Sequence, residues 1–168
     1  MSRRGGGGAN TNKGSSSSAG NRHAVAYTDG SCPNNGQAGA RAGWGTYWGP
    51  SHPNNQSGRV GGAQTNHRGE FQAAKQAIQQ AKSGGYASVT VRTDSELVVK
   101  TQDSYVHGWK SNGWTTKAGT AVKNQDLIRQ IDTMRTQIPV KFEHVRGHSG
   151  DVGNHAADAL ARKGAGKH

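Results

Sequence analysis

Four acidic residues occupy positions from which a folded chain could bring them together. Asp29 ends an apolar segment, and Asp94 ends a second one. Glu70 falls in the first turn of an amphipathic segment, and Asp158 lies about one turn into the last helical segment. In an α/β sheet, ligands gather at strand ends and at the starts of neighbouring helices, so these four side chains are expected to converge.

Carboxylates that lie close together favour the binding of divalent cations. They repel one another, so each resists ionisation unless a cation neutralises the group. Oxygen-only ligands select Mg²⁺ or Mn²⁺ over Zn²⁺. Two such ions roughly 3.5–4 Å apart would activate water and stabilise the leaving oxygen of a phosphodiester. The alternative is four unrelated surface acids, and for any single residue that interpretation is the better one, because Asp at a strand end is ordinary turn chemistry.

The composition points to a polyanionic partner. The chain has 168 residues with 21 Lys+Arg against 10 Asp+Glu, a net charge of +11, and nucleic acid is the leading partner for such a chain. No apolar run approaches about 18 residues, so no membrane span is expected. The single Cys32 excludes a disulfide framework and is compatible with a reducing compartment. We expect an intracellular protein, cytoplasmic or nuclear, with a mitochondrial location left open.

The first 22 residues differ from the rest of the chain. They hold four basic residues, no acidic residue and almost nothing apolar. Such a segment cannot bury enough surface to offset its ordering entropy, so residues 1–22 are predicted to be a disordered basic tail. Residues 23–168 are predicted to form one folded domain, which is still basic without the tail.

Hydrophobic patterning predicts the elements that must position the acids. A helix is expected over 67–82, capped by Asn66, because Phe71, Ala74 and Ile78 fall on one face. A helix followed by a protruding loop is expected over 106–120, with Trp114 in the core, and another helix follows the cap Asn124. The remaining expected elements are strands at 24–28, 43–48, 57–61, 89–93 and 140–145 and helices at 95–100 and 154–164. This order predicts a mixed sheet with helices on its faces.

The sequences around the acids form recognisable motifs. They are, in chain order, Tyr27-Thr28-Asp29-Gly30-Ser31, Thr65-Asn66-His67-Arg68-Gly69-Glu70, Thr93-Asp94-Ser95, and Gly147-His148-Ser149-Gly150 followed by Asn154-His155-Ala156-Ala157-Asp158. Together they closely resemble ribonuclease H type 1, over about residues 27–165 including the Trp-rich segment 108–114. The resemblance implies an α/β ribonuclease H-like fold, a five-stranded mixed sheet flanked by helices, with a basic Trp-containing protrusion.

The resemblance also implies an activity. A chain of this family is expected to be a monomeric endonuclease that cuts the RNA strand of RNA–DNA hybrids, leaving 5′-phosphate and 3′-hydroxyl ends. It would use two Mg²⁺ ions per site, with Mn²⁺ as a possible substitute, held by Asp29, Glu70, Asp94 and Asp158. His148 would assist proton transfer or product departure, for which a group that titrates near 6.5 is suited.

The two strands of a hybrid differ in the 2′-OH of the RNA, which small polar groups can read in a shallow minor groove. The resemblance implies RNA-strand contacts at Gly30, Ser31, Cys32, Asn35, Gln64 and Asn66. It implies DNA-strand contacts at Thr65, Trp109, Thr116 and Asn124. A Trp face can pack against deoxyribose where a 2′-OH would intrude.

Several positions depart from the family pattern. Leu97 and Tyr105 stand where relatives often carry bulkier aromatics, and His155 stands where Glu is common. Ala63 stands where an Arg is usual in the phosphate pocket. Two alternatives stay open: the pocket lacks one cation, or Arg59, four residues upstream, supplies it.

Two other functions remain open from the sequence. One is a noncatalytic hybrid-binding module, although none of the four carboxylates is missing. The other is a nuclease of the same fold that acts on DNA, against which the Trp-rich insertion and the Gly-His-Ser-Gly segment argue.

Overall fold

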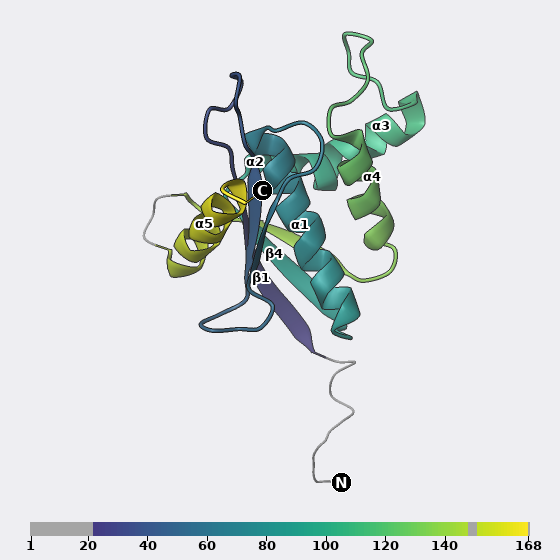
Figure 1. Cartoon of the computed structure of the whole chain (residues 1–168). Helices are drawn as coiled ribbons and strands as arrows, with labels where there is room; N and C mark the ends of the chain where they lie inside the picture. Colours follow the sequence, from purple (N-terminus) through teal and green to yellow (C-terminus); the bar gives the residue numbers. More distant parts are fainter. Residues whose placement is uncertain (1–21, 148–150, 168) are drawn as a thin grey trace, which may run out of the picture.

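The computed structural model describes residues 22–147 and 151–167. Residues 1–21, which make up nearly all of the predicted tail, therefore lie outside the described residues, and so does the predicted site residue His148. The elements follow one another through the whole described chain (Figure 1). In order they are β1 (His23–Ser31), β2 (Gly43–Tyr47), β3 (Gln56–Arg59), α1 (Asn66–Ser83), β4 (Ser88–Thr93), α2 (Glu96–Lys100), the π-helix η3 (Thr101–Tyr105), α3 (Val106–Asn112), α4 (Gln125–Met134), β5 (Val140–His144) and α5 (Val152–Ala165). Among these described elements, no helix is long and apolar enough to cross a membrane.

The five strands form one mixed sheet in the order β3-β2-β1-β4-β5, which confirms the predicted architecture. The pairs β1–β2 and β2–β3 are antiparallel, whereas β1–β4 and β4–β5 are parallel. In the parallel pair, Thr28 lies opposite Thr93. The next residue in each case, Asp29 and Asp94, therefore emerges at the same end of the sheet.

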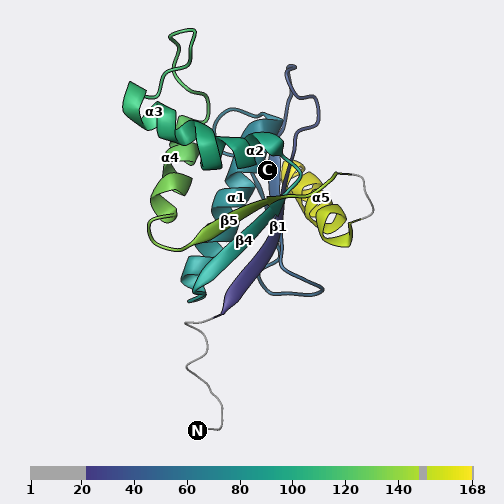
Figure 2. The ribbon, with the colours of Figure 1, turned by 180° about the vertical axis from the view of Figure 1, so that it is seen from behind.

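Helices cover both faces of the sheet (Figures 1 and 2). On one face α1 packs across β1, β2 and β4 with α4 beside it, and Phe71, Ile78 and Ile131 are fully or almost fully buried between them. On the other face α5 lies very close to β2. A Cβ atom on Gly43 would fall 2.1 Å from the backbone nitrogen of Ala165, so only glycine permits this approach.

The ends of some elements differ from those predicted. The N-cap of α1 is Thr65 rather than Asn66, because the extended Thr65 accepts a hydrogen bond from the Arg68 amide at 3.2 Å. Glu70 consequently lies just beyond the first turn. Asn124 does occupy the N-cap position of α4, but its left-handed backbone (φ 60°) leaves its side chain without a capping hydrogen bond. The last helix begins earlier than predicted because Asp151 caps it.

The helical segment that precedes the protruding loop is longer than the sequence pattern indicated. The helix expected to end at Lys100 continues through η3 into α3, and it ends where Gly113 adopts a left-handed conformation (φ 78°). The following loop extends beyond α3 and α4 (Figure 1). Trp114 at its base is 9% exposed and belongs to the core, as predicted.

Candidate active site

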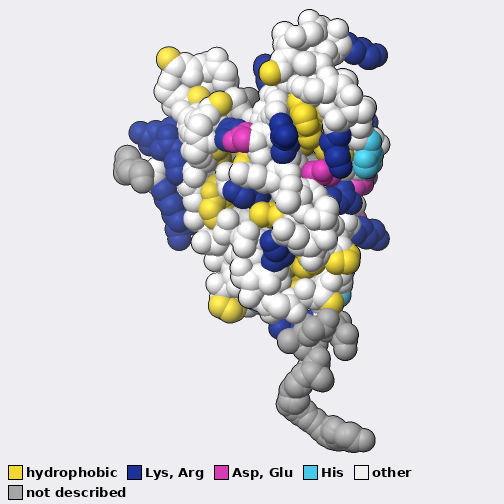
Figure 3. All heavy atoms as spheres, turned by 90° about the vertical axis from the view of Figure 1, so that its right-hand side faces the viewer, with side chains coloured by type: hydrophobic (Ala, Val, Ile, Leu, Met, Phe, Trp, Pro, Cys, Tyr) yellow, Lys and Arg dark blue, Asp and Glu magenta, His cyan; other side chains and the backbone are white. Residues whose placement is uncertain are grey.

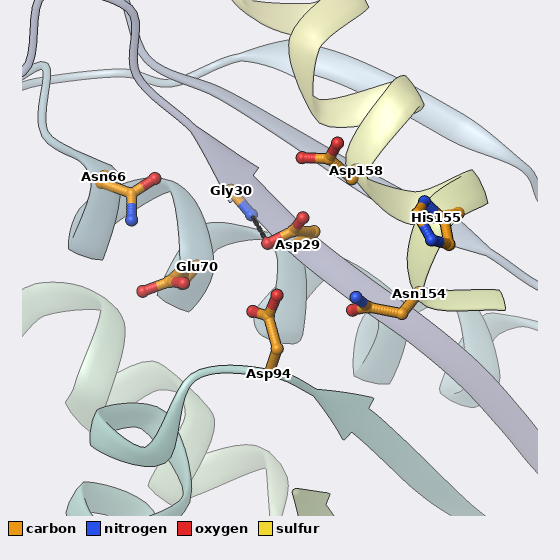
Figure 4. Close-up of a pocket in the computed structure, with 8 residues that line it drawn as sticks. All are labelled: Asp29, Gly30, Asn66, Glu70, Asp94, Asn154, His155 and Asp158. Atoms are coloured by element: carbon orange, nitrogen blue, oxygen red, sulfur yellow. Dashed lines mark hydrogen bonds between the residues drawn. The ribbon is translucent and has the colours of Figure 1, made fainter. Parts of the chain in front are cut away.

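Three of the four predicted carboxylates form a compact cluster. Asp29 lies near the end of β1, Glu70 near the start of α1, and Asp94 directly after β4. One ligand oxygen of each lies within 4.8 Å of the others, and the three side chains face one another in Figure 4. Asp29 is 5% exposed and Glu70 is 7% exposed. The structure thus brings together three carboxylates from separate elements, with Asp29 and Glu70 buried and Asp94 partly exposed, and we call them the acidic triad.

Gly30 allows the acidic triad to assemble. A Cβ atom at this position would fall 2.5 Å from the backbone nitrogen of Glu70 and 2.6 Å from the carbonyl carbon of Gly69. The absence of a side chain therefore lets the start of α1 lie directly on β1. The backbone amide of Gly30 also donates to the Asp29 carboxylate at 2.9 Å, which orients it.

Asp158 belongs to α5, which packs on the face of the sheet opposite to α1. It lines a pocket of about 160 Å³ that also contains the acidic triad, Gly30, Asn66, Asn154 and His155 (Figure 4). Its Oδ2 atom accepts hydrogen bonds from Nε of Arg162, at 2.9 Å, and from Nη2 of the same residue. The four predicted acids therefore share one pocket, although Asp158 is not a member of the cluster within 4.8 Å.

Crowding and burial make Asp29 and Glu70 costly to ionise. Burial raises the pKa of Asp29 to about 8, helped by repulsion from Asp94, Asp158 and Glu70 and opposed by the Gly30 amide. Burial also raises the pKa of Glu70, opposed by a hydrogen bond with His67. A cation would remove this cost, and the donors are all carboxylate oxygens, the ligands that suit Mg²⁺ and Mn²⁺. The residues present therefore fit a divalent metal site.

The raised pKa of Asp29 makes the stability of the metal-free protein depend on pH. Because the folded-state pKa lies above that of the unfolded chain, the free energy of unfolding falls as the pH rises from about 4 to about 8. Asp29→Asn keeps an oxygen to accept from Gly30 and removes this penalty. In EDTA at pH 8 we expect it to raise Tm by ~3 °C or more, since about 1 kcal/mol corresponds to roughly 2–4 °C in a domain of this size.

The increase in Tm should shrink as the pH falls to 4 and below, where Asp29 becomes protonated in the unfolded chain as well as in the folded protein. Asp132→Asn, on the surface of α4, is the matched control and should show no such pH-dependent gain. An Asp29→Asn variant that melts below the unmodified protein throughout pH 4–8 would contradict the described electrostatics. Melting curves in EDTA at three pH values are sufficient.

Two of the six residues predicted to contact RNA, Gly30 and Asn66, line the pocket. The other four, Ser31, Cys32, Asn35 and Gln64, do not line it but lie near these two in the chain, and we call the six residues together the rim. The Asn35 side chain accepts from the Asn66 amide at 3.2 Å, which ties the loop after β1 to the start of α1.

Gln64 has a structural role in this rim. Its side-chain oxygen accepts from the Ala42 amide at 2.8 Å and from Nε of Arg59 at 2.9 Å, and its nitrogen donates to the Val60 carbonyl at 2.7 Å. The Gln64 side chain is therefore engaged within the protein, and its backbone carbonyl accepts from the Cys32 thiol.

Three of the four residues predicted to contact DNA share a second, mainly apolar groove of about 290 Å³. Trp109, Thr116 and Asn124 line it. The other lining side chains include Phe71, Leu97, Val122 and Ile128. Thr65 is not part of this lining, but Arg68 of the turn that Thr65 caps donates to Oδ1 of Asn124 at 3.4 Å.

Arg68, rather than Arg59, contacts the Asn124 side chain. Arg68 donates from Nε to the Gly61 carbonyl at 2.6 Å, and its Nη atoms bind Asp126 at 2.9 and 2.6 Å. Arg59 instead donates to Gln64 and to the carbonyl of Lys167. Arg68 thus bridges the loop that contains Ala63 to the start of α4.

Sequence reasoning missed two residues of the site. Asn154 is 6% exposed, and its side-chain amide points toward Asp94 and Asp29 in Figure 4. Its spacing of four residues from Asp158 places both on one face of α5, and this signal was present in the sequence. His67 lines the second groove, and its Nδ1 lies 3.4 Å from Oε1 of Glu70, so it joins the two pockets.

Comparison with known proteins agrees with this geometry. The family model described as RNase H matches residues 21–166. Ribonuclease H1 of Mus musculus is 45% identical over 141 residues, covering 84% of this chain and 50% of the mouse protein. Ribonuclease H of Cyanothece sp. is 41% identical over 138 residues, covering 81% of this chain and 85% of that protein.

A solved structure shows the same likeness. The crystal structure of LC9-RNase H1, a type 1 RNase H with the type 2 active-site motif, superimposes with a TM-score of 0.70 at 29% identity, covering 87% of this chain and 73% of that chain. The chain spans about half the length of the mammalian relatives that it matches. The family model covers almost all of the described residues and includes all four acids of the pocket. The chain therefore belongs to the RNase H family.

Proposed function

We propose that this chain is a metal-dependent endonuclease that hydrolyses the RNA strand of RNA–DNA hybrids, leaving 5′-phosphate and 3′-hydroxyl ends. The observation that carries the proposal is the buried acidic triad beside an apolar groove, in a chain whose relatives are named Ribonuclease H and Ribonuclease H1. An all-carboxylate pocket repels a phosphodiester unless cations are present, so the cleavage must depend on a divalent ion.

In this proposal Asp29, Glu70, Asp94 and Asp158 hold two Mg²⁺ ions, for which Mn²⁺ can substitute. The bound ions would activate the attacking water and stabilise the charge on the leaving oxygen. The Gly30 amide orients Asp29, and His67 orients Glu70, so both carboxylates are in place before substrate binds. His148 is proposed to assist proton transfer or product departure, because an unperturbed imidazole titrates near neutral pH.

The two strands are proposed to lie on different sides of the acidic triad. Small polar groups and backbone atoms of the rim would read the RNA 2′-OH. These are Gly30, Ser31, Cys32, Asn35, Gln64 (through its backbone) and Asn66. The apolar groove would take the DNA strand, with the Trp109 face against deoxyribose. Thr65, Thr116 and Asn124 would donate to DNA phosphates, and Arg68 fixes Asn124.

The folded domain of residues 23–168 is proposed to act as a monomer inside the cell, with residues 1–22 adding only nonspecific electrostatic affinity.

The test compares three end-labelled duplexes of one sequence: an RNA–DNA hybrid, duplex RNA and duplex DNA. With Mg²⁺, we expect cleavage of the RNA strand of the hybrid alone, and EDTA should stop it. Hybrid binding without cleavage would establish the noncatalytic alternative, and cleavage of duplex DNA would establish a different nuclease of the same fold. Analysis of the product ends checks the predicted 5′-phosphate.

A further inference from the structure

A strip of positive charge without acidic partners borders the pocket. Residues 30–69 and 159–168 contain no Asp or Glu, yet they contain six Lys and Arg residues. Two of these six pair with acids from elsewhere, Arg68 with Asp126 and Arg162 with Asp158. The other four have no carboxylate within 4.0 Å among the described residues, and we call them the basic edge: Arg41, Arg59, Lys163 and Lys167.

The fold gathers these four residues at one place. Nη1 of Arg59 donates to the Lys167 carbonyl at 2.9 Å, and Nζ of Lys167 donates to the Ser57 carbonyl at 2.7 Å. Arg59 pairs with Gly43 across β2–β3, and Arg41 lies two residues before Gly43. Lys163 lies in the last turn of α5, which packs against Gly43. In Figure 3, Lys and Arg side chains cluster at the left margin of the molecule, and others are spread over the rest of the face in view.

The basic edge continues the rim on which the RNA strand is proposed to lie. Gly43 pairs with Ser31, so the basic edge and the acidic triad share one end of the sheet. Arg59 also holds the Gln64 side chain, whose backbone carbonyl accepts from Cys32. The apolar groove lies toward α2, α3 and α4, on the other side of α1 from this rim. A duplex with its DNA strand in the groove would therefore carry its RNA strand toward the basic edge.

Elsewhere on the described surface some cations pair with acids, as Arg92 does with Glu143 and Lys110 with Asp132, and others, such as Lys75 and Lys100, have no carboxylate within 4.0 Å. The basic edge differs in that all of its cations come from two segments that contain no Asp or Glu. Neighbouring like charges without counter-charges repel one another and raise a positive potential over the surface. Such a surface attracts nucleic acid phosphates through release of their counterions.

We propose that the basic edge binds phosphates of the RNA strand outside the segment that is cleaved. This inference rests on the proposed function, since it takes the RNA–DNA hybrid as the partner. It adds to that function a second contact region, away from the catalytic pocket, which increases affinity without reading the base sequence.

The test uses Arg41→Gln/Lys163→Gln in the full chain. It removes two positive charges, and neither side chain makes a hydrogen bond to another described residue. The control, Lys75→Gln/Lys141→Gln, removes the same charge from α1 and from the opposite sheet edge at β5, where Lys141 also loses an exposed ion pair with Glu143 at 3.7 Å. Fluorescence anisotropy in EDTA gives the hybrid Kd across a salt series without cleavage. We expect the slope of log Kd against log[salt] to fall by about two for the basic-edge variant, because each lost phosphate contact removes roughly 0.9. The control should keep the slope of the unmodified protein.

Single-stranded extensions of the hybrid show whether the basic edge binds the RNA strand or the DNA strand. A hybrid extended by single-stranded RNA, at one end or the other, should bind the unmodified protein more tightly than the blunt hybrid, and the basic-edge variant should lose this gain. An unchanged salt slope, or an equal gain from DNA overhangs that the variant retains, would overturn the inference. Cleavage by the unmodified protein is scored separately, so failure of the proposed function is recognised independently of these binding results.

Discussion

Asp94→Asn is expected to abolish cleavage of the hybrid while leaving its binding intact or slightly tighter. The change keeps the shape of the side chain and removes one of the four charges that would hold the divalent ions. We expect kcat to fall at least 10³-fold, equivalent to roughly 4 kcal/mol of lost transition-state stabilisation. The Kd for the hybrid should not rise, because one fewer carboxylate faces the phosphates.

The matched control for this prediction is Asp132→Asn. Asp132 lies on α4 and forms a surface ion pair with Lys110 at 3.0 Å, away from the acidic triad. Exposed ion pairs contribute about 0–1 kcal/mol, so this variant should retain full activity and nearly full stability. Single-turnover cleavage at saturating Mg²⁺ separates the two variants. Substantial turnover by Asp94→Asn under these conditions would remove the carboxylate cluster from the reaction.

Much of this site could be predicted from the sequence because strand ends are local features. The apolar runs before Asp29 and Asp94 predict two strands that end at an acid, and parallel pairing then places both acids at one end of the sheet. The same reasoning placed Glu70 at the start of a helix. These relations depend on short-range periodicity and on the rule that ligands gather at strand ends.

Contacts between distant parts of the chain could not be predicted in this way. Arg68 and Asp126 are 58 residues apart, and their pairing explains why Arg68 rather than Arg59 lies beside Asn124. The engagement of the Gln64 amide likewise depends on Ala42, which only the folded sheet brings near.

The uninterrupted helical run through η3 was missed for a different reason. Neither Gly nor Pro separates Lys100 from Val106, so no residue stops the helix at the predicted end.

Gly30→Ala is expected to lower both the stability and the activity of the protein, because α1 packs directly on β1 at Gly30. In Gly30→Ala the new methyl group would lie 2.5–2.6 Å from backbone atoms of Gly69 and Glu70, which cannot rotate away as a side chain would. Overpacking costs typically 1–3 kcal/mol, and we expect about 3 kcal/mol here because the neighbours are backbone. This corresponds to a Tm decrease of roughly 10 °C. The same shift of α1 would move Glu70 away from Asp29, and a displacement of about 1 Å can cost on the order of 10²-fold in rate.

Gly61→Ala is the matched control for Gly30→Ala. A Cβ atom on Gly61 meets no heavy atom within 4 Å, so the same substitution should change stability by no more than about 0.5 kcal/mol. Thermal melting reports the packing, and kcat at saturating hybrid separates displacement of Glu70 from weaker RNA contact at Gly30, which would raise KM. A Gly30→Ala protein that melts and cleaves like the unmodified chain would show that β1 and α1 are farther apart than described. The expected result, loss of both stability and kcat in this variant alone, would show that the close approach of α1 to β1 is what assembles the acidic triad.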